Sequence, residues 1–396
     1  MEHLLFDRLA EENLGALAAA GRYRQRQIFE SVGPVRLRAG GRVLVNFSSN
    51  NYLGLTHHPA VIEAVVGAVR RSGCGAGASP LVSGYFEEHA SAERALARWK
   101  HAGAAVLLPS GYQAAHAAVQ TITALAGGRT VRFFIDRLIH ASLIDGIAAS
   151  RARFRVFPHL DMERLRQLLE AAPPGELKVV VTESVFSMDG DSPELESLAA
   201  LKERYGFALL LDEAHASGVY GPEGAGLIAE KGLHSLPDVT IVTLSKGIGL
   251  CGGAVCGTAR FCEALVNFGR AMIFSTSVPP MIPAGVEAAL TVMRTEPERQ
   301  LRLRGMAAAA RRRLRAAGYE VAQSDCPIIP IILGSEESAL RASAKLREAG
   351  LLAAPIRPPA VPRGTSRLRI TLSCEHSEED VESLLRGLES LRNEGS

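Results

Sequence analysis

Reactive side chains follow four consecutive apolar runs of this sequence. They are Asp136 and His140 after residues 131–135, Glu183 and Ser187 after 179–181, Asp212, Glu213 and His215 after 208–211, and Ser245 and Lys246 after 240–244. In open parallel α/β sheets, ligands bind beyond the carboxyl ends of the strands. If each run is a strand of one such sheet, these acids, bases and nucleophiles meet at a single edge and form a site there.

Lys246 is the candidate nucleophile. It ends an apolar run and precedes the glycine-rich stretch 247–253. Burial disfavours the ammonium form and lowers the pKa of a lysine, which makes its amine available for a Schiff base. A strand-end lysine that extends its ammonium to solvent is the alternative. The other lysines lie in helical or turn contexts and are expected to be solvated: Lys100, Lys178, Lys202, Lys231 and Lys345.

Asp212 and His215 form a second candidate pair. A carboxylate at the end of a buried run is desolvated and needs a cationic partner. A protonated pyridine nitrogen suits this carboxylate, which in turn would keep the nitrogen protonated. His215, three residues later, could hydrogen-bond the same flat ligand. An aspartate that caps the next helix is the alternative interpretation of Asp212.

Three stretches could bind phosphate. Residues 110–112 open a predicted helix, whose free backbone amides attract anions, and residues 275–277 form a hydroxyl cluster. Residues 247–252 match the glycine spacing of a dinucleotide-binding loop. Such a loop requires a following helix and an acidic residue about 20 positions later. Here Gly269 stands at that position and residues 252–257 favour a strand, so a nicotinamide enzyme is the weaker interpretation.

The apolar runs also indicate the elements that position these residues. Runs 104–108, 131–135, 179–181, 208–211 and 240–244 are continuous, as expected for strands covered by helices on both faces. Their alternation with helical patterns predicts βαβ units and a mostly parallel sheet. We therefore predict an α/β fold with a large domain over 46–283. Residues 1–45 would form a helix (1–20) and a basic, irregular arm (22–42).

The carboxy-terminal part has a different pattern. Three prolines within 277–283 mark a boundary. We predict one long helix over 284–317, then a strand (328–333), a helix (335–348), a strand (368–372) and a helix (377–391). Ser377 and Asp380 would form a capping box at the start of the last helix. Residues 284–396 are thus predicted to form a smaller α+β domain.

Composition narrows the classes of function. The chain has 396 residues, of which 47% are hydrophobic and 22% charged, and its net charge is +2. This balance gives no reason to expect a nucleic-acid or membrane partner, and residues 311–313 are expected to form a solvated arginine face. Six cysteines without metal-ligand spacing predict reduced thiols, no metal site and a cytoplasmic location. The uncharged stretch 102–128 contains too many polar residues for a membrane span.

Together these motifs resemble those of the α-oxoamine synthases, a family of fold type I pyridoxal-phosphate enzymes. The matching stretches are 46–55, 81–84, 136–142, 183–190, 212–215, 243–246, 274–277, 356–362 and 367–370. The resemblance implies a large cofactor-binding domain with a smaller carboxy-terminal domain. It also implies pyridoxal 5'-phosphate as the cofactor and a homodimer with a shared active site.

The resemblance implies roles for individual residues toward this cofactor. Lys246 would hold it covalently, His140 would stack on its ring, Asp212 would pair with the ring nitrogen and His215 would bond its phenolic oxygen. These four form the implied catalytic set. Further contacts with the cofactor or its phosphate are implied for Gly111, Tyr112, Ser187 and Thr243, and for Ser275 and Thr276 toward the partner subunit.

The resemblance implies a second set of residues that bind the amino-acid substrate. Arg369 would hold the carboxylate of the amino acid, with Asn50 and His140 nearby. Arg24 matches a substrate-contacting arginine of the family. A surface arginine in an irregular arm is the alternative interpretation of Arg24.

The reaction implied is the joining of an amino acid to an acyl thioester with loss of carbon dioxide. Residues 356–359 favour L-alanine with pimeloyl-coenzyme A or a pimeloyl carrier protein, giving 8-amino-7-oxononanoate for biotin biosynthesis. Glycine or serine with another acyl donor is an open alternative, as is a non-catalytic binding protein, which the intact catalytic set opposes. Four departures from the family pattern bear on the acyl substrate and leave the cofactor set intact: Asn51, Ala115, Ser79 with Pro80, and Ala360.

Overall fold

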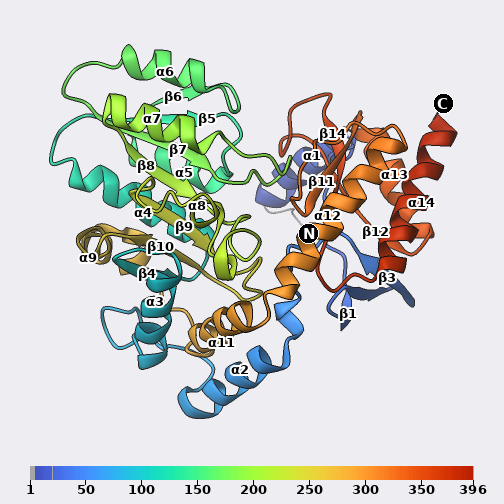
Figure 1. Ribbon diagram of the computed structural model, residues 1–396, viewed down its shortest axis with the longest axis horizontal. Helices are drawn as coiled ribbons and strands as arrows, with labels where there is room; N and C mark the ends of the chain where they lie inside the picture. Colours follow the sequence, from blue (N-terminus) through green and yellow to red (C-terminus); the bar gives the residue numbers. More distant parts are fainter. Residues whose placement is uncertain (1–4, 20, 396) are drawn as a thin grey trace.

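The structure is a computed structural model that describes residues 5–19 and 21–395. Figure 1 shows two lobes, the larger built around a seven-stranded sheet. Its strands follow in the order β4 (Ala104–Leu108), β10 (Gly253–Gly257), β9 (Val239–Thr243), β8 (Ala208–Asp212), β7 (Leu177–Glu183), β5 (Val131–Asp136) and β6 (Arg153–Phe157). All are parallel except β10, which runs antiparallel to β4 and β9. The predicted α/β fold with a mostly parallel sheet is confirmed.

Helices cover both faces of this sheet. One face packs against α4 (Gly111–Leu125), α5 (Ala141–Ser150) and α9 (Ala259–Phe268), and the other against α3 (Glu87–Trp99), α6 (Met162–Glu170) and α7 (Leu195–Tyr205). Successive residues of a strand point to opposite faces. Phe133 and Phe134 are accordingly both buried, but in different hydrophobic clusters. This double coverage explains why the strand sequences are continuously apolar.

The smaller lobe contains a three-stranded antiparallel sheet, with the order β11 (Ile328–Gly334), β14 (Ser366–Thr371) and β13 (Ala354–Ile356). Helices α12 (Glu298–Ala316), α13 (Glu336–Glu348) and α14 (Glu378–Gly395) accompany it. The predicted capping box is confirmed, since Asp380 N donates to Ser377 Oγ at 3.1 Å and Ser377 N donates to Asp380 Oδ2 at 2.9 Å. The predicted division of the chain at residues 46 and 284 stays a prediction.

The arm that was predicted to be irregular contains three short strands, β1 (Glu30–Gly33), β2 (Arg36–Ala39) and β3 (Arg42–Asn46). β12 (Leu351–Leu352) extends this sheet by pairing in parallel with β3. Gly40 and Gly41, with φ of 56° and 77°, form the turn between β2 and β3. A two-residue hairpin turn favours positive φ at both positions. The prediction was wrong because the arginines of these strands stay at least partly exposed, so their charge does not oppose pairing.

The single helix predicted over 284–317 is two helices, α11 (Met281–Thr295) and α12. They are separated by Glu296 and Pro297, and Glu296 has the non-helical angles φ −125° and ψ 58°. A proline lacks a backbone N–H and disfavours the helical conformation of the residue before it, so it interrupts the helix here. The first of the two helices packs against α2 (Pro59–Ser72) and α3 at the edge of the larger lobe (Figure 1).

Two basic residues that were predicted to be solvated are buried. Arg311 is 1% exposed, and its guanidinium donates to the backbone carbonyls of Ala322, Cys326 and Ile328. The side chain of Lys100 is 3% exposed, and its ammonium pairs with the buried carboxylate of Glu213. A buried cation is tolerated when its donors are hydrogen-bonded. The composition of a segment does not reveal this, because the acceptors come from other parts of the chain.

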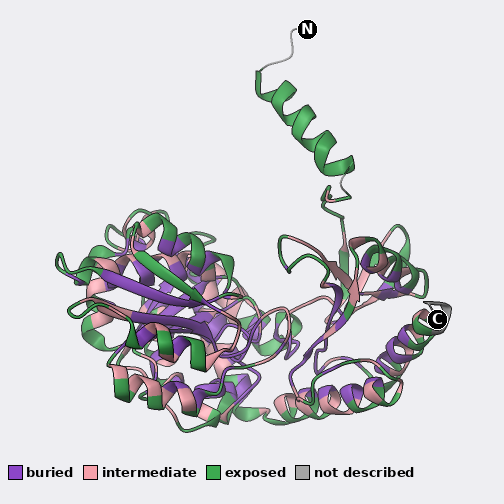
Figure 2. Cartoon of the chain, turned by 90° about the horizontal axis from the view of Figure 1, so that it is seen from above, coloured by how far each residue is buried: buried purple, intermediate pink, exposed green. Residues whose placement is uncertain are grey.

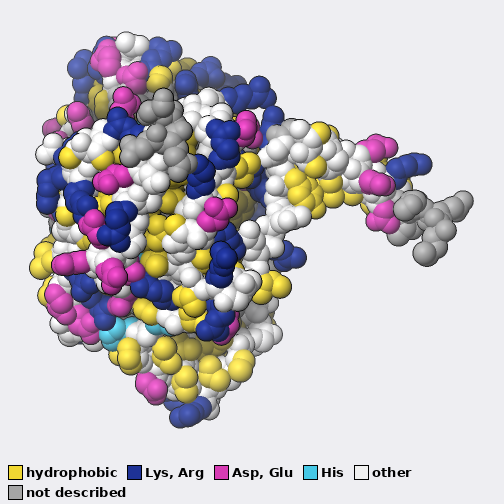
Figure 3. Space-filling model, turned by 90° about the vertical axis from the view of Figure 1, so that its right-hand side faces the viewer, with side chains coloured by type: hydrophobic (Ala, Val, Ile, Leu, Met, Phe, Trp, Pro, Cys, Tyr) yellow, Lys and Arg dark blue, Asp and Glu magenta, His cyan; other side chains and the backbone are white. Residues whose placement is uncertain are grey.

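The amino-terminal helix α1 (Leu5–Ala19) has no buried residue and projects from the rest of the molecule (Figure 2). Hydrophobic side chains lie on this projecting helix (Figure 3), among them Phe6, which is 81% exposed. The ends of the helix predicted over 1–20, residues 1–4 and 20, lie outside the described residues. None of the helices described is both long enough and apolar enough to cross a membrane. Short helical turns complete the fold: η1 (Leu55–His57), η2 (Pro222–Gly224), α8 (Leu227–Glu230) and α10 (Arg270–Ile273).

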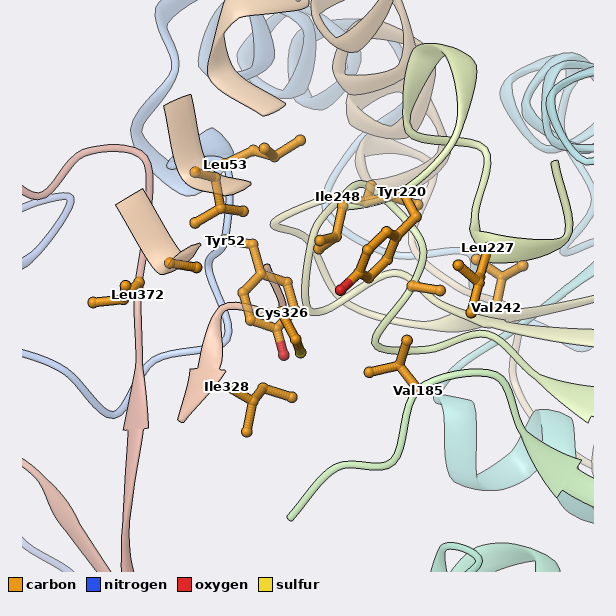
Figure 4. Packing of buried hydrophobic residues seen from close by; sticks show 14 of the residues in the cluster. Tyr52, Leu53, Val185, Tyr220, Leu227, Val242, Ile248, Cys326, Ile328 and Leu372 are labelled. Carbon is orange, nitrogen blue, oxygen red and sulfur yellow. The ribbon is translucent and has the colours of Figure 1, made fainter. Parts of the chain in front are cut away.

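A hydrophobic cluster joins the two lobes. Tyr52, which follows β3, is fully buried and lies close to Cys326 and Ile328 of the smaller lobe (Figure 4). Tyr220 and Val185 of the larger lobe belong to the same cluster. Apolar area buried between the lobes stabilises one relative orientation. Groups that follow the strands of the larger lobe are therefore held against groups of the smaller one.

Candidate active site

A cavity of about 260 Å³ lies at the carboxyl ends of β5, β7, β8 and β9. It is lined by Ser110, Gly111, Tyr112, His140, Ser142, Glu183, Asp212, Ala214, His215, Thr243, Ser245 and Lys246. The start of α4 and the turns after four parallel strands supply these residues. The structure thus brings most of the predicted strand-end groups together, as an open parallel sheet should. Asp136, Ser187 and Glu213 do not line the cavity.

Lys246 is hydrogen-bonded inside this cavity and does not simply extend to solvent. Its Nζ lies 2.9 Å from His215 Nε2, and His215 Nδ1 lies 2.6 Å from the hydroxyl of Tyr52. Burial lowers the pKa of Lys246, although the carboxylates of Asp212 and Glu183 act in the opposite direction. Burial also holds the pKa of His215 well below its ordinary value, so this imidazole is neutral. A neutral imidazole has one N–H and one acceptor nitrogen, and it can therefore link an amine to a hydroxyl.

Asp212 and Glu183 lie side by side at the ends of β8 and β7, where they are paired in register. They are 6% and 2% exposed, and burial raises the pKa of both carboxyl groups. Asp212 Oδ1 accepts a hydrogen bond from Ala214 N at 2.8 Å, so part of this carboxylate does cap the following turn. Within the described part of the chain, Glu183 Oε1 has no hydrogen-bond partner. Two adjacent buried carboxyls beside a cavity fit a flat ligand with a protonated ring nitrogen.

The start of α4 forms the opposite wall. Ser110 caps this helix, because its Oγ accepts from Gln113 N at 3.1 Å, and the first backbone amides point toward the cavity end of the helix. A Cβ atom on Gly111 would lie 2.5 Å from Thr243 Oγ1, so only glycine permits this approach to β9. Gln113 Nε2 donates to Ser275 Oγ at 3.0 Å, which places that hydroxyl beside the same helix start. This arrangement of amides and hydroxyls is suited to a phosphate.

Arg369 forms a second polar cluster, on β14 of the smaller lobe. It is 6% exposed, and its guanidinium donates to Ser187 O at 2.6 Å, to Thr371 Oγ1 at 2.9 Å and to Asn50 Oδ1 at 3.0 Å. Among the described residues, no acidic side chain forms a salt bridge with it. A buried guanidinium without a carboxylate partner can bind an anionic ligand in two-pronged geometry.

The remaining predicted site residues lie outside the lining of the cavity. Asn50 and Ser187 contact Arg369 and do not line the cavity itself. Thr276 is exposed on the segment after α10. Arg24 is exposed on the arm between α1 and β1, and within this one chain it is not brought to the cavity.

The predicted set lacked five residues that line the cavity and also Tyr52, which contacts His215; the five are Ser110, Ser142, Glu183, Ala214 and Ser245. Glu183 was recognised only as a strand-end acid, and Tyr52 was recognised only as part of a matching stretch. Tyr52 and His215 are separated by 163 positions, so no local spacing links them. The rival interpretation of residues 247–252 as a dinucleotide loop is wrong, because a turn leads from β9 into the antiparallel strand β10 and no helix follows.

Comparison with known proteins shows the family to which the chain belongs. The sequence profile of the aminotransferase class I and II family matches residues 42–388. The 8-amino-7-oxononanoate synthase of Anaeromyxobacter dehalogenans (strain 2CP-1) is 44% identical over 378 residues, covering 95% of this chain and 93% of that protein. The same enzyme of Saccharophagus degradans is 40% identical over 390 residues, covering 98% of this chain and 97% of that protein.

Solved structures give the same result. A serine palmitoyltransferase from S. paucimobilis, solved with bound PLP–myriocin aldimine, has a TM-score of 0.91 at 30% identity and covers 98% of both chains. The 8-amino-7-oxononanoate synthase of Francisella tularensis has a TM-score of 0.76 at 25% identity, covering 89% of this chain and 98% of that one. The chain therefore belongs to the aminotransferase class I and II family and, within it, to the α-oxoamine synthases.

Proposed function

We propose that this protein is a pyridoxal-phosphate-dependent acyltransferase that makes 8-amino-7-oxononanoate. It would condense L-alanine with a pimeloyl thioester of coenzyme A or of a carrier protein. The net reaction forms a bond between the alanine Cα and the acyl carbonyl carbon and releases the thiol and carbon dioxide. The observation that carries the proposal is the pairing of Lys246 with His215 beside two buried carboxyls, in a chain 44% identical to an enzyme of this name.

The cavity has the groups that this cofactor requires. Pyridoxal phosphate supplies an electron-poor ring that stabilises negative charge at the carbon bearing the amino group. The Lys246 amine would hold the cofactor, Asp212 would pair with its ring nitrogen, His215 would bond its phenolic oxygen, and His140 would stack on the ring. Its phosphate would meet the start of α4. Gly111, Tyr112 and Thr243 would contact the cofactor or its phosphate, as would Ser275 and Thr276 toward a partner subunit, whereas Ser187 does not line the cavity and is not placed to join them.

Two residues of this chain would act on the amino acid directly. Arg369 would bind its carboxylate, with Asn50 fixing one side of the guanidinium. Lys246 Nζ would take the proton from Cα and return a proton after carbon dioxide has left. A lowered pKa favours this exchange, because an amine serves as a base only when it is unprotonated. The chain contributes mainly position and preorganised charge.

Chemical trapping tests the attachment site. Borohydride treatment of the cofactor-loaded protein, followed by peptide mass mapping, should leave a pyridoxyl adduct on Lys246. Lys246→Ala should lose the adduct and turnover, since no other amine lines the cavity in the described residues. Lys231→Ala is the control, because that side chain is 45% exposed and remote from the cavity. An adduct on another lysine would contradict the assignment.

The choice of substrates needs a separate experiment, since serine palmitoyltransferases share this fold closely. A matrix of alanine, glycine and serine against pimeloyl, acetyl, succinyl and palmitoyl thioesters should release carbon dioxide fastest for alanine with pimeloyl. Coenzyme A and carrier-protein forms of the donor are compared in the same matrix. Preference for another pair would replace the substrates and keep the reaction type.

We also propose that the protein works as a homodimer in the cytoplasm. Large hydrophobic side chains stand exposed next to polar residues that would serve a shared site. Phe274 is 70% exposed and adjoins Ser275 and Thr276, and Ile28 is 94% exposed and near Arg24 in sequence. A partner subunit would cover them and bring these polar residues to a shared site. The six cysteines are all free, which supports a reducing compartment.

A further inference from the structure

His159 lies outside the cavity, held between two carboxylates. Its Nδ1 is 2.9 Å from Asp136 Oδ1 and its Nε2 is 3.0 Å from Asp191 Oδ2. The ring also meets Phe186 edge-on, with 4.4 Å between the ring centroids. Partial burial opposes a charge here, but the two carboxylates raise the pKa of His159 to about 10. At neutral pH both ring nitrogens are therefore protonated, and each donates to one carboxylate.

One end of this bridge is fixed. Asp136 is fully buried at the end of β5, and its carboxylate also accepts from Leu138 N at 2.8 Å and from Leu160 N at 2.9 Å. The hydrogen bonds from Leu138 N and Leu160 N hold the Asp136 carboxylate in one position. His159 therefore attaches the segment that contains Asp191 to the end of β5.

The other end belongs to the loop of residues 184–191, which leads from β7 toward α7. Asp191 O accepts from Phe186 N at 2.9 Å, and Phe186 O accepts from Gly190 N at 2.9 Å, so the loop closes on itself. An edge-on aromatic contact between Phe186 and His159 adds to this attachment. The first residues of the loop are held to the larger lobe by the Ser184 N–Asp212 O hydrogen bond (2.9 Å) and by the buried side chains of Val185 and Phe186, and its last residue, Asp191, is held by the His159 imidazolium.

The far side of the same loop reaches the smaller lobe. Ser187 O accepts from Arg369 Nε at 2.6 Å, and the Asp189 carboxylate pairs with Arg367, which is 4% exposed. The direction of the Arg369 guanidinium depends on where the Ser187 carbonyl stands, since a hydrogen bond at Nε sets the plane of the group. A displaced loop would remove the contact at Nε and leave the guanidinium held only at Nη1, by Asn50 and Thr371.

We propose that His159 is a positioning residue for the amino-acid carboxylate. By bridging Asp136 and Asp191 it holds the loop 184–191, whose Ser187 carbonyl orients Arg369. This inference rests on the proposed function, because it takes Arg369 as the group that binds the substrate carboxylate. His159 touches neither the cavity nor its lysine, so its loss should alter substrate binding more than the chemical step.

Two variants and one control test this role. His159→Gln removes the charge and one of the two bridges, whereas His159→Arg keeps a cation with donors for both carboxylates. His58→Gln is the matched control, because His58 also pairs with a carboxylate, Glu296 at 3.1 Å, and lies at the start of α2. KM for the amino acid, kcat, the absorbance of bound cofactor, and amide hydrogen exchange over 184–191 are measured for each.

His159→Gln should raise KM for the amino acid about tenfold, with kcat changed less than about threefold and the cofactor absorbance unchanged. Exchange over 184–191 should become faster, and His159→Arg should recover most of both effects. The control should match the wild type. Unchanged KM with unchanged exchange, or a loss confined to kcat, would overturn the proposal. If the wild type condenses no amino acid with any thioester, the proposed function fails, while the exchange data still decide whether His159 holds the loop.

Discussion

Hydrogen bonds connect Lys246 of the larger lobe with Arg369 of the smaller one. Lys246 Nζ lies 2.9 Å from His215 Nε2, and His215 Nδ1 lies 2.6 Å from the Tyr52 hydroxyl. The Tyr52 hydroxyl in turn lies 3.4 Å from Asn50 Oδ1, which accepts from Arg369 Nη1 at 3.0 Å. The long contact between Tyr52 and Asn50 is the weakest of these links. Burial raises the pKa of the Tyr52 hydroxyl, so it remains a donor as well as an acceptor. The proposed proton-transfer and carboxylate-binding groups are therefore ordered by one network.

Behind this network, Glu213 is paired with a buried lysine. Lys100 Nζ donates to Glu213 Oε2 at 2.9 Å, to Ser217 Oγ at 2.8 Å and to Ala225 O at 2.6 Å, and Glu213 Oε1 accepts from Ile228 N at 3.1 Å. All three ammonium donors are thus used. Because Glu213 follows Asp212 directly, the pair anchors the backbone that carries Asp212.

At the residue scale we expect Lys100→Met to reduce the free energy of unfolding by about 3–5 kcal/mol, because it leaves a buried carboxylate unpaired. Lys100→Met combined with Glu213→Gln should recover most of this loss. Lys231→Met, which breaks an exposed pair with Glu196, should cost at most about 1 kcal/mol. Urea unfolding followed by circular dichroism measures all three. A double variant no more stable than Lys100→Met would show that packing, not charge pairing, determines the effect.

At the scale of elements, His376 joins the end of β3 to the turn before α14. It is fully buried, its Nδ1 accepts from Ser373 N at 2.9 Å, and its Nε2 donates to Asn46 O at 3.2 Å. Its ring stacks on Phe47, with 4.3 Å between centroids. Because Nδ1 must accept a hydrogen bond, the junction requires a neutral imidazole, and burial lowers the pKa of His376 to about 4.

This junction predicts a loss of stability in acid. The pKa of His376 is about 6.5 in the unfolded chain, above its folded value, so the unfolded state binds a proton first as the pH falls. Stability should decrease between pH 6.5 and 4, by up to about 3 kcal/mol from this group. His376→Gln keeps a neutral donor and acceptor and should flatten this part of the curve. Urea unfolding from pH 7 to 4 compares the two proteins, and parallel curves would contradict the prediction.

At the scale of the whole molecule, the exposed hydrophobic residues carry the dimer proposal. Phe274→Asp should shift the protein toward monomer in analytical ultracentrifugation and weaken cofactor binding about tenfold or more, because the segment 274–276, which we propose faces the partner subunit, would lose the side chain that the partner would bury. Leu301→Asp is the control, since Leu301 is 69% exposed against 70% for Phe274 and lies on α12. A dimer that persists in Phe274→Asp with unchanged cofactor affinity would refute this interface.

The sequence by itself determined the α/β class, the strands β4, β5, β7, β8, β9 and β10, and the gathering of Asp212, His215 and Lys246 at one edge, whereas β6 was not predicted. These features depend on local periodicity and on the common direction of parallel strands, and both can be recognised from the order of residues. The hairpin at Gly40 and the break at Pro297 were also local signals, and they were overlooked.

Only the tertiary structure decided which polar residues are buried and what they meet. Lys100 and Glu213 are 113 positions apart, and Asn50 and Arg369 are 319 apart. A cation or a hydroxyl is stable in the interior when acceptors surround it, and those acceptors arrive from segments whose proximity depends on the packing of whole elements. For this reason the burial of Arg311, the contact of Tyr52 with His215 and the bridge at His159 could not be obtained from the order of residues.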